Sequence, residues 1–216
     1  MGVRDENRAR MKYNILQTTL ELMKEKPFEC ITVKEICSPN NISEVTFFKI
    51  FRMKEEILLY FMQVWNLKRT VRISESGMKK GVAAIYLIFK DIALTDNSLN
   101  IMISLISFLS NLKKVPNQIK LDSYDKVEIL KNEDYRIVDV EELEMQLLRH
   151  LKEAVADNEI HRSTDLLRTV KIIAGIFYGV PLVSHMGFSK DLYGDYTDSL
   201  DLLFMALKQG KERQYE

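Results

Sequence analysis

The chain has 216 residues, 46% of them hydrophobic and 29% charged, which is the composition of a soluble globular protein with one large domain or a small domain joined to a larger one. The formal net charge is zero, so bulk charge gives no support for nucleic-acid binding. We expect no membrane span, because Lys90 and Asp91 interrupt the most apolar stretch, and no secretion signal at the N-terminus. Two cysteines, Cys30 and Cys37, spaced like core positions, exclude a disulfide framework and favour a reduced, cytoplasmic protein.

The distribution of charge is more informative than its sum. Residues 1–72 hold 13 Lys and Arg against 9 Asp and Glu, whereas the remainder holds 18 against 22. A basic front and an acidic rear fit a DNA-contacting head on a body that does not touch DNA, although an asymmetry this mild decides little. Only four prolines and eight glycines, mostly at the edges of periodic segments, predict an all-α protein.

The first helix is expected over residues 7–26, because Ile15, Leu16, Leu22 and Met23 recur at helical spacing and Pro27 closes it. Residues 1–8 are polar and expected to be frayed. Their arginines form a basic arm that either contacts phosphates or, more commonly for a terminus, is only solvated.

Residues 32–54 contain two short capped segments joined by a polar turn. Thr32 and Glu35 have the spacing of a capping box, and Ser43 is placed to cap a second helix. Between them, Pro39 is expected to push Ser38 out of the helical region and end the first helix near Cys37. Asn40 or Asn41 is suited to the left-handed conformation of a sharp corner. This pattern predicts a helix-turn-helix, whose second helix enters the DNA major groove.

Further helices follow, and the pattern predicts them over residues 54–72, 78–94, 96–112, 141–157, 165–185 and 196–209. The first of these is long enough to belong to both head and body. Ser163 or Thr164 is the expected cap of the helix over 165–185, which Pro181 should kink or shorten. Gly175 and Gly179 on it would let another helix approach closely. Residues 113–139 show no helical period and are interpreted as a functional flap or a partly structured connection.

The front of the chain resembles the tetracycline-repressor (TetR) family of bacterial transcriptional regulators. The resemblance covers residues 9–60 without a gap, and the matching residues are Ile15-Leu16, Leu22-Met23, Thr32-Val33, Ile36-Cys37, Ile42-Ser43, Thr46-Phe47-Phe48, Phe51 and Lys54-Glu55-Glu56-Ile57. It implies an all-α homodimer of about nine helices per subunit, joined through the last two helices. It also implies a DNA-binding head, a family-like domain over about 9–69 with the head proper at 1–54, and a ligand-binding and dimerisation body at 55–216.

Four positions depart from the family pattern. Val45 replaces a glycine, and Phe48 replaces a tyrosine whose hydroxyl contacts a phosphate. Met53 replaces a serine that would cap the next helix, and the loss of this cap lowers local stability by about 1 kcal/mol. Glu44 places a negative charge at the start of the reading helix, where it suits the helix dipole and could accept from cytosine N4 but repels phosphate.

The expected DNA contacts lie on or beside the reading helix; they are Thr32, Ser43, Glu44, Val45, Thr46, Phe48, Lys49 and Lys54. The resemblance implies that Thr32 and Lys54 contact phosphates. The simpler interpretation is that Thr32 is only a helix cap and that Lys54 is only a solvated charge. The expected walls of an effector pocket are Trp65, Tyr86, Phe89, Met102, Phe108, Phe177 and His185. Aromatic and Met residues at helical spacing more often form core than contact a ligand.

No cofactor or metal is expected, since the three histidines are widely separated and lack a ligand spacing. Catalysis is not expected, because the chain has no glycine-rich phosphate loop and no G-x-S-x-G. The sequence therefore predicts a cytoplasmic, ligand-responsive transcriptional regulator, a repressor released from a palindromic operator by a small-molecule effector. The alternative is a TetR-like interaction module or co-activator that binds a partner protein and no longer reads DNA. Val45, Phe48 and Glu44 keep this alternative open.

Overall fold

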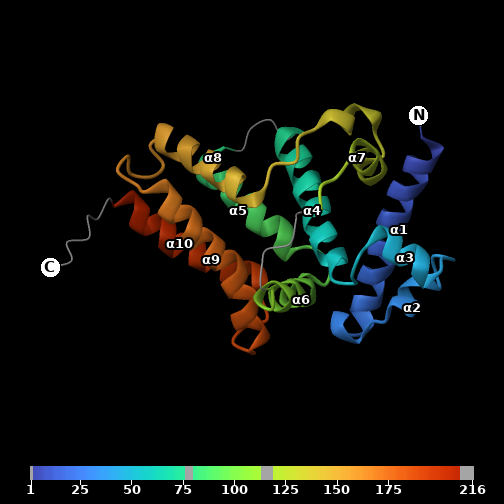
Figure 1. Cartoon of the computed structure of the whole chain (residues 1–216). Coiled ribbons are helices and arrows are strands. Elements are labelled where there is room, and N and C mark those ends of the chain that lie inside the picture. Colours follow the sequence, from blue (N-terminus) through green and yellow to red (C-terminus); the bar gives the residue numbers. More distant parts are fainter. Residues whose placement is uncertain (1, 76–79, 113–118, 210–216) are drawn as a thin grey trace. The chain divides into compact units, whose positions relative to one another are not determined.

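The computed structural model describes residues 2–75, 80–112 and 119–209 (Figure 1). These residues form ten α-helices and two short 3₁₀ helices, η1 and η2, and no strand, so the all-α prediction is confirmed. The elements are α1 (Val3–Glu25), η1 (Phe28–Cys30), α2 (Val33–Cys37), α3 (Glu44–Ile50), α4 (Glu56–Glu75), α5 (Gly81–Ala93), α6 (Ser98–Ser110), α7 (Ser123–Leu130), η2 (Glu133–Ile137), α8 (Leu143–Ala156), α9 (Leu166–His185) and α10 (Leu192–Lys208).

Contacts divide the chain into two compact units. Unit 1 comprises residues 1–71 and 100–140, and unit 2 comprises residues 72–99 and 141–216. The division falls within α4, which is continuous across it. The predicted head at 1–54 and body at 55–216 are a functional division and stay a prediction. Unit 1 contains the residues of the predicted head and, in addition, most of α4 and α6 and all of α7.

In unit 1, α1 packs against η1, α2 and α7. Its apolar side buries Ile15, Leu16 and Met23, which are at most 1% exposed, as the helical spacing predicted. Phe47 and Phe51 extend this core from α3, with ring centroids 5.9 Å apart, and Phe51 also contacts the ring of Tyr60 in α4. The aromatic contacts fix α3 by its inner side and leave the other side to solvent.

In unit 2, α5 packs against α8 and α10, and α9 packs against α8 and α10. Phe89 of α5 contacts Phe177 of α9 and Tyr196 of α10, with ring centroids 5.6 Å and 4.9 Å away. The Tyr196 hydroxyl donates to the Phe177 carbonyl at 2.7 Å, so this buried hydroxyl has its hydrogen bond. The three helices therefore meet at an aromatic core.

The structure corrects several expectations near the ends of elements. Residues 3–8 are helical rather than frayed, and the N-cap of α9 is Asp165, which accepts from the Arg168 N–H, rather than Ser163 or Thr164. Pro181 does not shorten α9, which runs on to His185. Cys37 is buried as predicted, but Cys30 is exposed.

Of the two interpretations of residues 113–139, the partly structured connection is borne out, because the described part, residues 119–139, contains α7 and η2. One broader expectation was wrong. The prediction that no stretch is long and apolar enough for a membrane span fails for α9, whose length and hydropathy pass that test. Because α9 packs on α8 and α10, the simplest explanation of its hydropathy is a helix that covers a protein core.

Candidate nucleic-acid interface

Helix α2 begins at a complete capping box. The Glu35 N–H donates to Thr32 Oγ1 at 3.3 Å, and the Thr32 N–H donates to Glu35 Oε2 at 2.9 Å. Lys26 Nζ donates to the other carboxylate oxygen of Glu35 at 2.5 Å. The hydrogen bond from Lys26, and after it those from Thr32, lower the pKa of Glu35 to about 2. The capping box was predicted from spacing, whereas the partner Lys26 was not, because it comes from the end of the preceding segment.

The turn between α2 and α3 is tied to α1 by Asn40. Its amide donates to Thr18 Oγ1 at 2.9 Å and to the Ile36 carbonyl at 2.8 Å. Asn41 takes the left-handed conformation (φ 52°), as predicted for one of the two asparagines. Ser38 stays in the right-handed helical region (φ −57°, ψ −53°), so the expectation that Pro39 would displace it was wrong. The hydrogen bonds of the turn outweigh the steric preference that Pro39 imposes.

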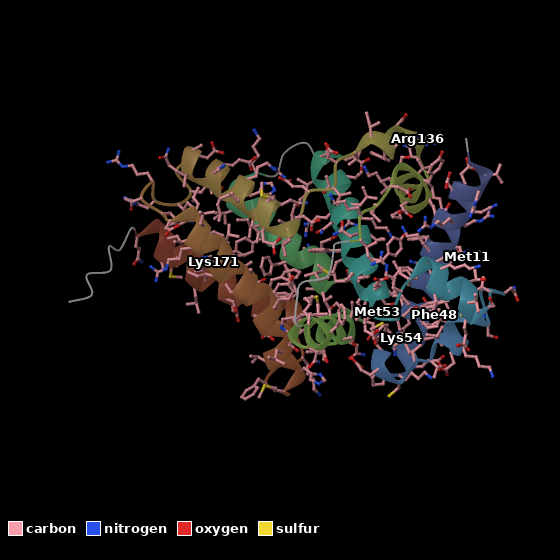
Figure 2. The ribbon with its side chains drawn as sticks, in the orientation of Figure 1. Met11, Phe48, Met53, Lys54, Arg136 and Lys171 are labelled. Atoms are coloured by element: carbon pink, nitrogen blue, oxygen red, sulfur yellow. The ribbon has the colours of Figure 1, made fainter. Side chains whose placement is uncertain are left out.

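Helix α3 starts at Ser43, whose hydroxyl accepts from the Thr46 N–H at 3.1 Å. Phe47 is fully buried and anchors the helix to the core of unit 1. Away from this core, α3 exposes Val45, which is 66% exposed, and Phe48, which is 48% exposed. Figure 2 labels Phe48. Glu44 and Lys49 are also exposed, and Thr46 is half-buried. The helix therefore turns a mixed apolar and charged surface outward.

Lys54 lies between α3 and α4 and is engaged inside unit 1 (Figure 2). Its Nζ donates to the carbonyls of Phe28, Glu29 and Ile31 at 2.8, 3.2 and 2.7 Å, and lies 4.6 Å from the centre of the Phe28 ring. An ammonium has three donors, so all of them are directed at these carbonyls. This geometry favours a structural role for Lys54 over the predicted phosphate contact.

The start of α4 lacks the serine cap of the family pattern, as Met53 indicated. Glu56 Oε2 accepts from the Arg52 N–H at 2.7 Å, a hydrogen bond that ties the start of α4 to the residue before Met53 but does not cap the helix. Met53 itself is 42% exposed. The helix begins at Glu56, two residues later than predicted.

The seven predicted pocket residues lie in both compact units, and their role as pocket walls stays a prediction. Phe89 and Phe177 form the aromatic core of unit 2, whereas Trp65 and Met102 are buried in unit 1, and Phe108 is half-buried there. Tyr86 Oη donates a short hydrogen bond to Asp201, and burial raises the pKa of Tyr86. His185 is exposed at the end of α9. Three of the seven residues thus lie in unit 1 and four in unit 2.

Unit 2 also has a hollow of about 730 Å³, which the sequence did not indicate. Its lining combines α5, the connection from α8 to α9, and the end of α10; the residues are Val82, Ala83, Asp157, Asn158, Glu159, Ile160, His161, Arg162 and Lys208. None of the seven predicted pocket residues is among them. In the part of the chain that the structure describes, no group of three or more His, Cys, Asp or Glu could hold a metal ion.

No family model matches the chain, and neither does any curated protein. Among solved structures, a candidate TetR-family transcriptional regulator from Syntrophomonas wolfei is similar over 95% of this chain and 98% of its own, with a TM-score of 0.55 and 16% identity. NemR from E. coli, in its reduced form, is similar over 91% and 96%, with a TM-score of 0.55 and 14% identity. A protein of unknown function from Rhodococcus sp. RHA1 is similar over 92% of this chain and 96% of its own, with a TM-score of 0.55 and 14% identity. The chain thus has the fold of a TetR-family regulator.

Proposed function

We propose that this chain is a cytoplasmic DNA-binding transcriptional regulator of the TetR type. The observation that carries the proposal is the outward side of α3. A hydroxyl cap at Ser43 fixes the start of this helix and the buried Phe47 fixes its inner side, while Glu44, Val45 and Lys49 remain exposed. A short helix held in this way behind a tight turn is the arrangement that inserts side chains into the major groove.

The proposed DNA contacts follow from the chemistry of the exposed residues. Val45 suits the methyl group of thymine, Glu44 suits the amino group of cytosine, and Lys49 suits a phosphate. Thr32 and Ser43 cap their helices and could also donate from their hydroxyls to phosphates. Phe48 offers apolar contact only. Thr46, whose Oγ1 lies 3.0 Å from Ser43 Oγ, supports the cap rather than reading bases.

The dimer is proposed to form through α9 and α10. Much of the exposed apolar surface lies on these two helices and the connection between them; its members are Leu167, Ile172, Leu182, Val183, Met186, Phe188, Leu202 and Met205. A Cβ added at Gly175 or Gly179 would meet nothing within 4 Å, and both glycines border an open hollow of about 560 Å³. A second copy of the chain would cover this surface, as expected for a large apolar patch. Two-fold symmetry then calls for a palindromic operator.

Release of the operator by a small molecule is the mode of regulation that the fold resemblance implies. Unit 2 offers a hollow of about 730 Å³, within the usual size range of about 300–1,000 Å³ for ligand pockets. Its lining carries His161, Arg162 and Lys208 beside Asp157 and Glu159, so a polar effector suits it.

The test is DNA binding with a matched pair of variants. Val45→Glu places a negative charge in the proposed groove-facing surface, and Leu94→Glu places one at a position of similar exposure (64%) at the end of α5. Gel shifts use duplexes that flank the chain's own coding region, with random duplexes as competitors. We expect sequence-selective binding that Val45→Glu abolishes and Leu94→Glu preserves. Equal binding by both variants would refute the assignment of α3.

The alternative function, docking of a partner protein, is favoured by one observation. Val45 and Phe48 expose apolar surface on the same helix, and Met53 exposes more just after it. A helix-sized apolar patch is also what a protein partner would cover. Absence of DNA binding by the wild-type chain at low salt would favour this alternative over the DNA-binding function.

A further inference from the structure

A hollow of about 360 Å³ in unit 1 is lined by an unusual concentration of positive charge. Arg8 reaches it from α1, Lys49 and Arg52 from the end of α3 and the link to α4, and Lys120 from the residues before α7. We call these four residues the basic cluster. All four are exposed, and none forms an ion pair with a described residue. The cluster therefore gathers charges from three segments of the chain that are far apart in sequence.

The other charged residues of this hollow are already engaged. Lys12 Nζ donates to Asp125 Oδ2 at 2.5 Å, and Glu56 Oε2 accepts from the Arg52 N–H at 2.7 Å. Glu56 is the one acidic residue in the lining, so the cluster retains an excess of positive charge. Four like charges held close together without partners oppose folding, and an external anion would relieve that repulsion.

Lys120 is held in this place by α7, which the sequence did not predict. Leu121 beside it is buried, and Asp122 caps α7 by accepting from the N–H groups of Tyr124 and Asp125 at 2.8 Å. The Asp125 carboxylate is fully buried and pairs with Lys12, which fastens α7 to α1. Burial raises the pKa of Asp125 and Lys12 opposes that rise. The backbone at Lys120 is thus anchored to the helix that supports the head.

We propose that the basic cluster binds the phosphate backbone of DNA, and that Lys120 supplies a phosphate contact from outside the three-helix head. The inference rests on the proposed DNA-binding function and extends it. Lys49 belongs both to the exposed side of α3 and to the hollow, so the cluster continues the proposed groove-facing surface. Duplex DNA carries one negative charge per about 1.7 Å of its axis, so a duplex lying on α3 would bring phosphates alongside.

The experiment measures the salt dependence of binding to a random-sequence duplex of about 30 base pairs. Lys120→Gln removes one charge from the cluster, and Lys152→Gln removes one from an exposed, unpaired position on α8 as the matched control. Each phosphate contact contributes about 0.9 to the slope of log K against log salt. A dimer loses two contacts, so we expect Lys120→Gln to reduce the slope by about 1.8. Between 50 and 200 mM salt, the loss of affinity of this variant should therefore be about tenfold smaller than the loss of affinity of the wild-type chain. Lys152→Gln should keep the wild-type slope.

The other outcomes separate the inference from the proposed function. A wild-type slope in Lys120→Gln, with normal binding by the wild-type chain, would overturn the role of Lys120 and leave the proposed function intact. Absence of DNA binding by the wild-type chain would overturn both. Calorimetric titration with inorganic phosphate gives a further arm: binding that Lys120→Gln abolishes, together with an unchanged DNA slope, would assign the cluster to a small anion. Because Lys120 is exposed and one of four like charges, the variant should unfold at a temperature no lower than that of the wild-type chain.

Discussion

Replacement of Lys54 by methionine tests whether this lysine holds the head together or contacts DNA. Methionine keeps an apolar side chain of similar length and removes the ammonium. Two of the three hydrogen bonds, to Phe28 and Ile31, are part-buried and 2.8 and 2.7 Å long, whereas the third, to Glu29, is exposed. Hydrogen bonds to a charged group contribute about 1.5–3 kcal/mol each to stability, net of the hydrogen bonds to water that they replace. Partial exposure lowers that figure to about 1 kcal/mol for each part-buried bond, and the Phe28 ring adds about 0.5 kcal/mol.

We therefore expect Lys54→Met to destabilise unit 1 by about 2–3 kcal/mol, or about 5–10 °C in unfolding temperature. Urea unfolding followed by fluorescence reports on this unit, because Trp65 is the chain's only tryptophan and is buried in α4. Lys34→Met removes an exposed lysine from α2 and should leave the midpoint unchanged. The slope of DNA affinity against salt should stay at its wild-type value. An unchanged midpoint together with a slope reduced by about 0.9 per chain would refute this reasoning and restore the phosphate contact.

Three further predictions concern pH, the anchoring of α7 and the dimer. The folded-state pKa of Glu35 is about 2, below its ordinary value of 4.5, chiefly because of the hydrogen bond from Lys26. Its stabilising effect is therefore complete above pH 4.5 and lost as the pH falls towards 2, so the unfolding temperature of the wild-type chain should approach that of Glu35→Gln across this window. Asp125→Asn leaves the charge of Lys12 buried without its partner and should lower the free energy of unfolding by about 3 kcal/mol in urea titration, whereas an effect below 1 kcal/mol would show that the pair is dispensable. Gly179→Glu meets open space within one chain, so it should keep its helix content by circular dichroism but sediment as a monomer in ultracentrifugation; a dimer would place the interface elsewhere.

Features that depend on neighbours within four residues were predicted from the sequence. The capping box at Thr32, the cap at Ser43 and the left-handed asparagine were all confirmed, because each donor and acceptor lies on the same short segment. Phe47, one of the residues that match the family pattern, is buried on the inner side of this capped helix. Together these residues sufficed to predict the helix-turn-helix segment at the centre of the candidate site.

Features that depend on distant segments were missed. Helix α7 shows little periodicity of its own, and its position depends on an ion pair between Asp125 and Lys12, which is 113 residues away. Lys54 was predicted to contact a phosphate or to be solvated, because nothing local shows that three carbonyls would surround its ammonium. The predicted pocket residues were chosen for residue type and helical spacing, and such a pattern cannot distinguish the core of one unit from that of the other.

The sequence by itself determined the class of fold, the two capped helices and the outward residues of the second, since short-range hydrogen bonds and apolar spacing are written along the chain. Only the tertiary structure decided which cations are engaged and which are free to meet an anion. Lys12 and Lys54 are held by groups inside unit 1, whereas Arg8, Lys49, Arg52 and Lys120 line one hollow without an ion-pair partner among the described residues. The reason is physical: the partner of a long charged side chain is set by which backbone and side-chain groups come within about 3 Å of it, and that depends on packing between segments.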